Sequence, residues 1–326
     1  MEDLTVENNS IRVQKALKLF REQANHNEAY RNFLFQLDID PDTVRGLTKI
    51  PFLPISFFKT HRLQTGDFEP QICFESSGTT GVQTSRHCIV SLDRYLDNTR
   101  KNFIHFYGDP ADFCFLALLP SYLERSNSSL VSMADHFMKL SGHPNNGFFL
   151  NDFENLRQTL IRLETAGQKT ILLGVTFALL DFAERYSLDL KHTIVMETGG
   201  MKGRKQEITR EELHEFLMKR MGVGSIHAEY GMTELQSQAY SFGKGFFRSS
   251  DTMIVLMRSP DDPFEVWTST EYPYRTGMIN IIDLANSDTM AFIATDDLGR
   301  FNPDGSFEIL GRVDHADIRG CSLLVV

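Results

Sequence analysis

Apolar runs alternate with amphipathic stretches through the middle of the chain. Residues 113–120 form a continuous apolar run, as is typical of a strand buried on both faces of a sheet. Residues 169–175, 193–198 and 225–231 are further predicted strands. Helical patterns lie between them, at residues 128–142, from residue 151, at 176–186 and at 209–222. This alternation predicts an α/β fold in which helices cover a mostly parallel sheet.

Capping signals mark the predicted helices. Ser91 can cap a helix at residues 91–106. Gly142 can end the helix predicted at 128–142, because glycine readily adopts the left-handed conformation of a helix end. Thr209 with Glu212 has the spacing of a capping box, and Asn151 with Glu154 resembles one.

The N-terminal part and the C-terminal part differ from this middle region. A helical pattern covers residues 10–37, the prolines in 49–58 predict an extended or turning segment, and 71–74 predict a short buried strand. After Gly231 short strand patterns follow one another, with turns of Pro, Gly and Asp between them, at residues 252–257, 264–267, 278–282, 290–295 and 306–310. We therefore expect an α/β core at 1–245 and a β-rich subdomain at 246–326.

Composition narrows the class of protein. The 326 residues are 41% hydrophobic and 23% charged, which is ordinary for a soluble globular protein. The net charge of −10 argues against binding to nucleic acid or to an anionic membrane. No window reaches the length of a membrane span, and the N-terminus lacks a signal peptide, so we expect a cytoplasmic protein. The 26 phenylalanines fit an aromatic core or an apolar substrate pocket.

The four cysteines carry no metal-site signal. Cys73, Cys88, Cys114 and Cys321 form no CxxC pair and no zinc-ligand spacing. The pattern predicts reduced thiols, as in cytoplasmic proteins.

The stretch SSGTTG at 76–81 is the first candidate for chemistry. A turn rich in Gly, Ser and Thr after a strand offers backbone N–H groups and hydroxyls to phosphate oxygens. It lacks the Gly-Lys-Ser/Thr ending of a Walker A loop. Taken alone, it favours an ordinary surface loop, because loops of this composition are common.

Two downstream segments favour the phosphate interpretation. Glu234 follows a predicted strand end together with Tyr230 and Thr233, where a carboxylate suits Mg²⁺ and an aromatic ring suits a stacked purine. Asp297 and Arg312 belong to the later segment 295–320, and these side chains can bind ribose hydroxyls or phosphate. Each feature also has a purely structural alternative: Glu234 as a carboxylate at a helix N-terminus, Tyr230 as a core residue, and the segment 295–320 as a surface β-hairpin.

The set of motifs resembles the adenylate-forming (AMP-producing) enzyme superfamily. SSGTTG, YGMTE and TDDLGR…GRVDHADIRG occur in its order and rough spacing, from about Cys73 to Gly320. The segments at 51–63, 119–130, 198–204 and 319–326 are most similar to its acyl-protein synthetase branch, of the LuxE type.

The resemblance implies ATP, AMP and Mg²⁺ as ligands and gives roles to the matching residues. Glu234 would bind Mg²⁺, Tyr230 would pack on adenine, and Thr233 would contact the α-phosphate. Asp297 would bind ribose hydroxyls, with Arg312 beside them. The loop that would hold the ATP phosphates consists of Ser76, Ser77, Gly78, Thr79, Thr80 and Gly81.

Other matches and departures follow from the same resemblance. Gly199 and Gly200 would run along the purine edge, whereas Asp296 stands where the superfamily usually has glycine. The superfamily's mobile C-terminal domain and its adenylation lysine are expected to be absent, because the sequence stops at the hinge-like GRVDHADIRG region. Lys202 and Lys59 are candidate substitutes.

Cys321 is the candidate acyl acceptor. Acyl-protein synthetases use a cysteine near the C-terminus, and Arg319 could favour the Cys321 thiolate; the alternative is a buried structural cysteine. We expect ATP-dependent activation of a fatty or aryl acid to acyl-AMP, followed by transfer to Cys321, coenzyme A or a carrier thiol. An acyl-reductase or transferase partner would fit this chemistry. The other hypotheses are an acyl-CoA ligase of the phenylacetate type and an inactive nucleotide-binding scaffold subunit.

Overall fold

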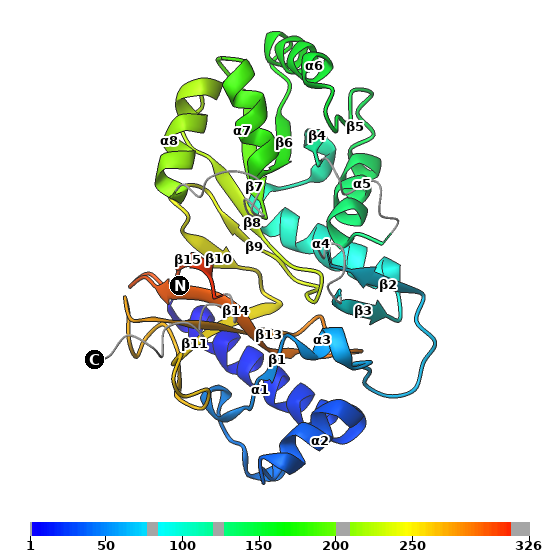
Figure 1. Ribbon diagram of the computed structural model, residues 1–326, viewed down its shortest axis with the longest axis vertical. Coiled ribbons are helices and arrows are strands. Elements are labelled where there is room, and N and C mark those ends of the chain that lie inside the picture. Colours follow the sequence, from blue (N-terminus) through cyan, green and yellow to red (C-terminus); the bar gives the residue numbers. More distant parts are fainter. Residues whose placement is uncertain (1, 77–83, 120–126, 200–208, 314–326) are drawn as a thin grey trace, which may run out of the picture.

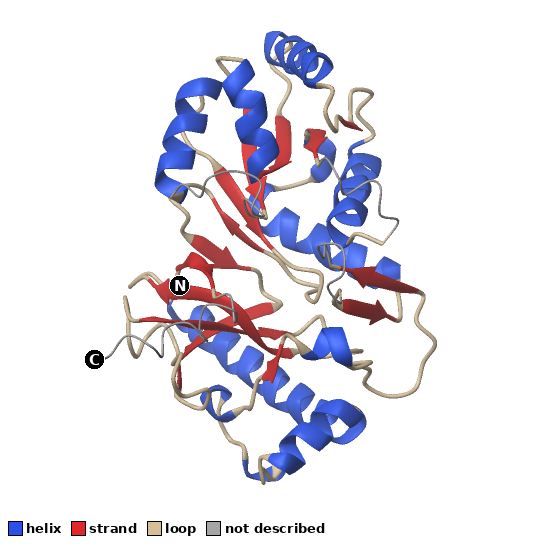
Figure 2. Ribbon diagram, in the orientation of Figure 1, coloured by secondary structure: helices blue, strands red, loops and turns tan. Residues whose placement is uncertain are grey.

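The computed structural model describes residues 2–76, 84–119, 127–199 and 209–313. Helices and strands alternate through its middle, as Figures 1 and 2 show. The helices are α1 (Glu2–His26), α2 (Glu28–Gln36), α3 (Phe57–Thr60), α4 (Leu92–Tyr107), α5 (Ser129–Ser141), α6 (Phe153–Thr165), α7 (Thr176–Arg185) and α8 (Arg210–Met221). Three short 3₁₀ helices cover Pro41–Thr43, Leu47–Lys49 and Pro110–Asp112.

The strands fall into one large sheet and one small one. They are β1 (Leu53–Pro54), β2 (Ile72–Glu75), β3 (Arg86–Ile89), β4 (Cys114–Leu118), β5 (Gly147–Phe148), β6 (Thr170–Val175), β7 (Thr193–Thr198), β8 (His227–Tyr230), β9 (Ala239–Ser241), β10 (Phe247–Ser249), β11 (Met253–Arg258), β12 (Val266–Trp267), β13 (Thr276–Asp283), β14 (Phe292–Phe301) and β15 (Phe307–Arg312). The large sheet has 13 strands in the order β12-β11-β13-β14-β15-β10-β9-β8-β7-β6-β4-β5, with β1 beside β14.

The direction of pairing changes along this sheet. Neighbours from β5 through β4, β6 and β7 to β8 run parallel. From β8 onward, through β9, β10, β15, β14, β13, β11 and β12, neighbours are antiparallel. Figure 1 shows α7 and α8 on one side of the parallel strands and α4 and α5 on the other. The predicted α/β fold, with a parallel core and a β-rich C-terminal part, is confirmed.

Apolar packing forms two main clusters. One joins buried side chains of the parallel strands and their helices between Phe103 and Tyr240. The other joins residues 16–63 to residues 228–307, so that the N-terminal helices cover the C-terminal strands. Buried rings such as Phe20, Phe182 and Phe292 support the interpretation of the phenylalanines as core residues. The division into 1–245 and 246–326 stays a prediction.

Most predicted caps are present. The Ser91 hydroxyl accepts from the Arg94 amide, and Thr209 with Glu212 forms a full capping box. Gly142 closes α5 with a left-handed φ of 61°. The start predicted at Asn151 is wrong by one residue, because the Asp152 carboxylate accepts from the Asn155 amide and caps α6.

The helix predicted at 10–37 is interrupted. α1 ends at His26, and the Asn27 side chain then caps α2 by accepting from the Tyr30 amide. The same side chain donates to the Thr289 carbonyl at 2.8 Å. A break at this position therefore lets one asparagine both start a helix and tie it to the C-terminal strands.

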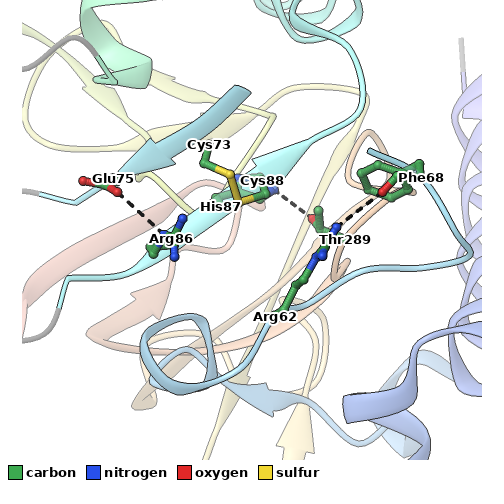
Figure 3. Close-up of a disulfide and its surroundings, with 8 residues drawn as sticks. All are labelled: Arg62, Phe68, Cys73, Glu75, Arg86, His87, Cys88 and Thr289. Carbon is green, nitrogen blue, oxygen red and sulfur yellow. Dashed lines mark hydrogen bonds and ion pairs between the residues drawn. A yellow bond between two sulfur atoms is a disulfide. The ribbon is translucent and has the colours of Figure 1, made fainter. Parts of the chain in front are cut away.

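The strand predicted at 71–74 is β2, and it pairs only with β3 in a separate two-stranded sheet. In that register Cys73 stands opposite Cys88, and their sulfurs form a disulfide (Figure 3). The prediction of reduced thiols is wrong for this pair, because strand register brings the two side chains together and sequence spacing does not reveal it. Cys114 is a free, buried cysteine.

Among the described helices none combines the length and the apolar character needed to cross a membrane.

Candidate functional site

A buried carboxylate links the end of β8 to the β14–β15 hairpin. The Tyr230 hydroxyl donates to Asp297 Oδ2 at 2.8 Å, and Arg312 Nε donates to Asp297 Oδ1 at 2.8 Å. Asp297 and Arg312 face each other in the register of β14 and β15. The Asp297 side chain is 7% exposed, whereas that of Arg312 is 63% exposed. The sequence-predicted trio is therefore one connected group that opens to solvent through Arg312.

The Tyr230 ring is fixed from several directions. It makes edge contacts with Phe247 and Phe307, whose ring centroids both lie 6.0 Å from its own. Burial, followed by the negative charge of Asp297, raises the pKa of Tyr230 well above its usual value. The phenol therefore stays protonated and acts as the donor to Asp297.

Glu234 lies just beyond β8 and is 6% exposed. Burial raises the pKa of its carboxyl group, while a hydrogen bond with the Ser85 side chain and the positive charges of Arg312 and Lys59 act to lower the pKa. This carboxylate thus belongs to the same group as Arg312, and Lys59 of α3 is near enough to influence it. The described residues contain no cluster of three or more His, Cys, Asp or Glu side chains that could hold a metal ion.

One carboxylate nevertheless fits the way Mg²⁺ accompanies nucleotides. This ion keeps several waters and usually binds through one or two carboxylates plus the substrate's own phosphate oxygens. Glu234, buried and bonded to the Ser85 side chain, supplies such a carboxylate. The donor set therefore fits a magnesium ion that arrives with a nucleotide and not one in an all-protein cage.

The backbone around Thr233 and Glu234 is held by two polar side chains that the sequence analysis missed. His87 Nδ1 lies 2.8 Å from the Thr233 carbonyl oxygen, and Asn286 Nδ2 donates to the Glu234 carbonyl at 2.9 Å. His87 Nε2 lies 2.8 Å from the Thr289 hydroxyl. Burial lowers the pKa of His87, which favours the neutral ring, and Nδ1 is the nitrogen that donates, because its partner is a carbonyl oxygen.

The predicted phosphate loop is described only at its first residue. Ser76 is tied across the β2–β3 hairpin, where its amide donates to the Ser85 carbonyl at 3.1 Å and its hydroxyl accepts from the Ser85 amide at 2.9 Å. Because Ser85 also bonds Glu234, Ser76 is linked to the turn that follows β8. Several other predicted site residues lie outside the described part of the chain: Ser77, Gly78, Thr79, Thr80, Gly81, Gly200, Lys202 and Cys321.

Gly199 directly follows β7, which pairs with the strand that carries Tyr230. Its φ is +73°, and its carbonyl accepts from the Thr176 hydroxyl at 3.4 Å. In the parallel register of β7 and β8, Thr198 stands opposite Glu229. The carboxyl ends of these strands therefore bring Gly199 and Tyr230 to one edge of the sheet, where ligands of open α/β sheets bind.

Two buried glutamates at this edge were also missed. Glu197 accepts from Arg210 Nε at 3.2 Å and lies 3.0 Å from His214 Nε2. Burial acts to raise the pKa of Glu197, but the His214 hydrogen bond and the Arg210 charge outweigh it and lower the pKa. Charged residues inside the apolar runs TIVMET and HAEY were the available signal.

Unlike Glu197, Glu229 has no positively charged side chain among its described hydrogen-bond partners. The Thr198 hydroxyl donates to its Oε2 at 2.6 Å, and a side chain at Gly231 would collide with its Oε1. Burial raises the pKa of Glu229 to about 7, although the Thr198 hydrogen bond opposes the shift. The carboxyl group therefore titrates near neutral pH, one residue before Tyr230.

A family model covers nearly the whole chain. The model described as "Acyl-protein synthetase, LuxE" matches residues 3–326. No curated protein matches the chain.

Solved structures of adenylate-forming enzymes share the fold. An open conformation of 2-hydroxyisobutyryl-CoA ligase, in complex with 2-HIB-AMP and CoA, has a TM-score of 0.67 at 13% identity over 95% of this chain and 71% of its own. MenE, the O-succinylbenzoate coenzyme A synthetase from Bacillus subtilis, in complex with AMP, has a TM-score of 0.51 at 14% identity over 75% of this chain and 50% of its own. The amide bond synthetase McbA from Marinactinospora thermotolerans has a TM-score of 0.51 at 15% identity over 77% and 51%.

The share of length covered differs among these structures. The chain spans from 50% to 71% of the length of the three structures. At such low identity the likeness shows the fold.

We predict that Glu229 makes stability fall as pH rises toward neutral. Its folded pKa of about 7 lies above the ordinary 4.5, so the folded state holds a proton that the unfolded state has lost between these values. The free energy of unfolding that this proton contributes is fully present below the pKa of the unfolded state. It is lost as the pH rises through the pKa of the folded state. Relative to Glu229→Gln, the wild type should lose about 3 kcal/mol at most between about pH 4 and pH 8.

Urea unfolding of both proteins across this pH range measures the difference, and Gln keeps an acceptor for Thr198. Glu215→Gln, an exposed residue of the neighbouring helix α8, is the matched control and should follow the wild type. Parallel pH profiles for the wild type and Glu229→Gln would contradict the assignment.

Proposed function

This chain belongs to the LuxE acyl-protein synthetase family, and from that membership we propose that it activates a carboxylic acid with ATP and passes the acyl group to a thiol. The carrying observation is the group formed by Tyr230, Asp297 and Arg312, next to the buried Glu234, at the carboxyl ends of parallel strands. Its aromatic ring, carboxylates and exposed guanidinium suit the base, ribose and charged parts of a nucleotide.

Each described residue has a role in this proposal. Asp297 keeps acceptor capacity for ribose hydroxyls, because a carboxylate has about four lone-pair sites and two are used by Tyr230 and Arg312. Tyr230 and Gly199 border the adenine, Thr233 lies at the α-phosphate, and Ser76 begins the phosphate loop. Glu234 would hold a nucleotide-borne Mg²⁺, which would offset charge on the phosphates.

The reaction has two steps. A carboxylate oxygen of the acid attacks the α-phosphorus of ATP, and pyrophosphate leaves, so that acyl-AMP forms. A thiolate then attacks the acyl carbonyl, and AMP leaves. Arg312 and Lys59 place positive charge near the reacting phosphates in the first step, where little proton transfer is needed; Lys202 is the further candidate for this role.

The acyl acceptor in the second step is proposed to be Cys321, from the sequence resemblance. Coenzyme A is the second candidate, because 2-hydroxyisobutyryl-CoA ligase, whose fold this chain shares, was solved with CoA and an acyl adenylate. The acid is proposed to be fatty or aryl, and the acyl group would pass to a carrier thiol or to an acyl-reductase or transferase partner. We place the enzyme in the cytoplasm.

We predict carboxylate-dependent exchange of labelled pyrophosphate into ATP. Asp297→Asn should lower the exchange rate at subsaturating ATP by about tenfold or more, because a charge-assisted hydrogen bond contributes about 1.5–3 kcal/mol. Asp304→Asn, in the turn of the same hairpin, is the matched control and should leave the rate unchanged. ATP binding without exchange, across aliphatic and aromatic acids, would instead favour an inactive scaffold.

We predict that Cys321→Ser separates adenylation from acyl transfer. Exchange should persist, because the first step needs no thiol, while the covalent acyl-protein detected with a labelled acid should disappear. Cys114→Ser, a change at a cysteine of β4 that forms no disulfide, should keep the covalent label if it folds. Continued formation of a CoA thioester by Cys321→Ser would remove the acyl-cysteine and favour the CoA ligase.

A further inference from the structure

The disulfide between Cys73 and Cys88 lies in the hairpin that leads into the candidate site. The two residues face each other on β2 and β3, and the bond encloses the sequence of the predicted phosphate loop, with a separation of 15 residues (Figure 3). Both residues are half-buried, so a small disulfide or dithiol can reach them. The large sheet does not include these strands.

The strand β3 also contacts the turn that carries Thr233 and Glu234. His87, the neighbour of Cys88, lies 2.8 Å from the Thr233 carbonyl, and Ser85 bonds the Glu234 side chain. Side chains alternate along a strand, so Ser85 and His87 are buried toward the site while Arg86 lies on the other face and is exposed. A change in how β3 is held therefore reaches the turn directly.

The other described contacts of this hairpin are non-covalent, and they include the hydrogen bonds of His87 and one from the Glu75 amide to the Asn127 carbonyl at 2.9 Å. Its two strands share four residue pairs, and an isolated two-stranded hairpin is marginally stable. The ion pair between Arg86 and Glu75 spans 3.6 Å on the surface, with side chains 63% and 45% exposed, and such pairs contribute little. Phe74 and Ile89 pack with Tyr95 in a small cluster. The disulfide is the one covalent link among these described contacts.

We propose that Cys73 and Cys88 form a redox modification site that sets how firmly the hairpin holds the Thr233–Glu234 turn. One cysteine thiolate attacks a small-molecule disulfide and releases one thiol. The second thiolate attacks the resulting mixed disulfide and releases the other. Two protein thiols and one disulfide thus become one protein disulfide and two thiols, and a dithiol reverses the exchange.

The oxidised form is the one in which the site is preorganised. Cross-linking β2 to β3 restricts the hairpin whose Ser85 and His87 contact the Thr233–Glu234 turn, so ligand binding has less conformational freedom of that turn left to restrict. Oxidised protein should bind ATP more tightly than reduced protein. This consequence rests on the proposed function, whereas the effect on the turn does not.

Hydrogen exchange of the full chain without ligand tests the structural part. The wild type is oxidised with glutathione disulfide or reduced with dithiothreitol, and peptide mass mapping confirms the Cys73–Cys88 link. Reduction should speed exchange at the β3 amides and at Leu235, whose amide bonds the Met232 carbonyl, by about threefold or more. Unchanged exchange at both places, or failure of the link to form, would overturn the proposal.

The ATP dissociation constant, measured on the same two samples by calorimetry, tests the functional consequence. Reduced protein should bind about fivefold more weakly. The double variant Cys73→Ser/Cys88→Ser, which keeps Cys114 and Cys321, should match the reduced protein and ignore both reagents. The comparison of oxidised with reduced wild type stands if that variant fails to fold.

Two outcomes separate this proposal from the proposed function. Redox-dependent exchange without ATP binding in either state would support the redox site and count against the proposed function. Equal ATP affinity in both states, with the disulfide formed, would overturn the preorganising role.

Discussion

The site depends on one buried negative charge, that of Asp297. Removing a carboxylate from water costs several kcal/mol unless its partners compensate, and here Tyr230 donates to one oxygen while Arg312 donates to the other. Tyr230 comes from the end of the parallel part of the sheet, whereas Asp297 and Arg312 come from the antiparallel part. Satisfying this charge therefore fixes the two parts of the site relative to each other.

The neighbouring turn at Thr233 and Glu234 is also held by polar partners, but these partners bind its backbone carbonyls. Carbonyls of Thr233 and Glu234 are engaged by His87 and Asn286, so these two contacts hold the turn through its backbone. His87 belongs to the hairpin closed by Cys73 and Cys88, and the hairpin in turn meets Glu234 through Ser85. The turn beyond β8 is therefore contacted both by hydrogen bonds and by a hairpin that carries a disulfide.

Much of the fold could be predicted because its signals are local. Ser91 caps α4 and Thr209 caps α8 through residues only three positions away, and apolar runs mark the buried strands. The pairing of Cys73 with Cys88 depends on strand register, which spacing in the sequence does not encode. His87, Asn286 and Glu229 are single polar residues without a recurring pattern. Tyr230 and Asp297, 67 positions apart, were found together only because the whole motif set resembles a known superfamily.

If the acid is activated on the α-phosphate of ATP, an oxygen atom of the acid is transferred to AMP, and isotope labelling detects that transfer. The full chain is incubated with ATP, Mg²⁺ and a panel of aliphatic and aromatic acids whose carboxyl oxygens carry oxygen-18, with hydroxylamine to capture the acyl group. The attacking oxygen stays with phosphorus when the acyl group leaves, so the AMP should contain one labelled oxygen. Label in inorganic phosphate with formation of ADP, or unlabelled AMP beside a captured acyl group, would contradict activation on the α-phosphate.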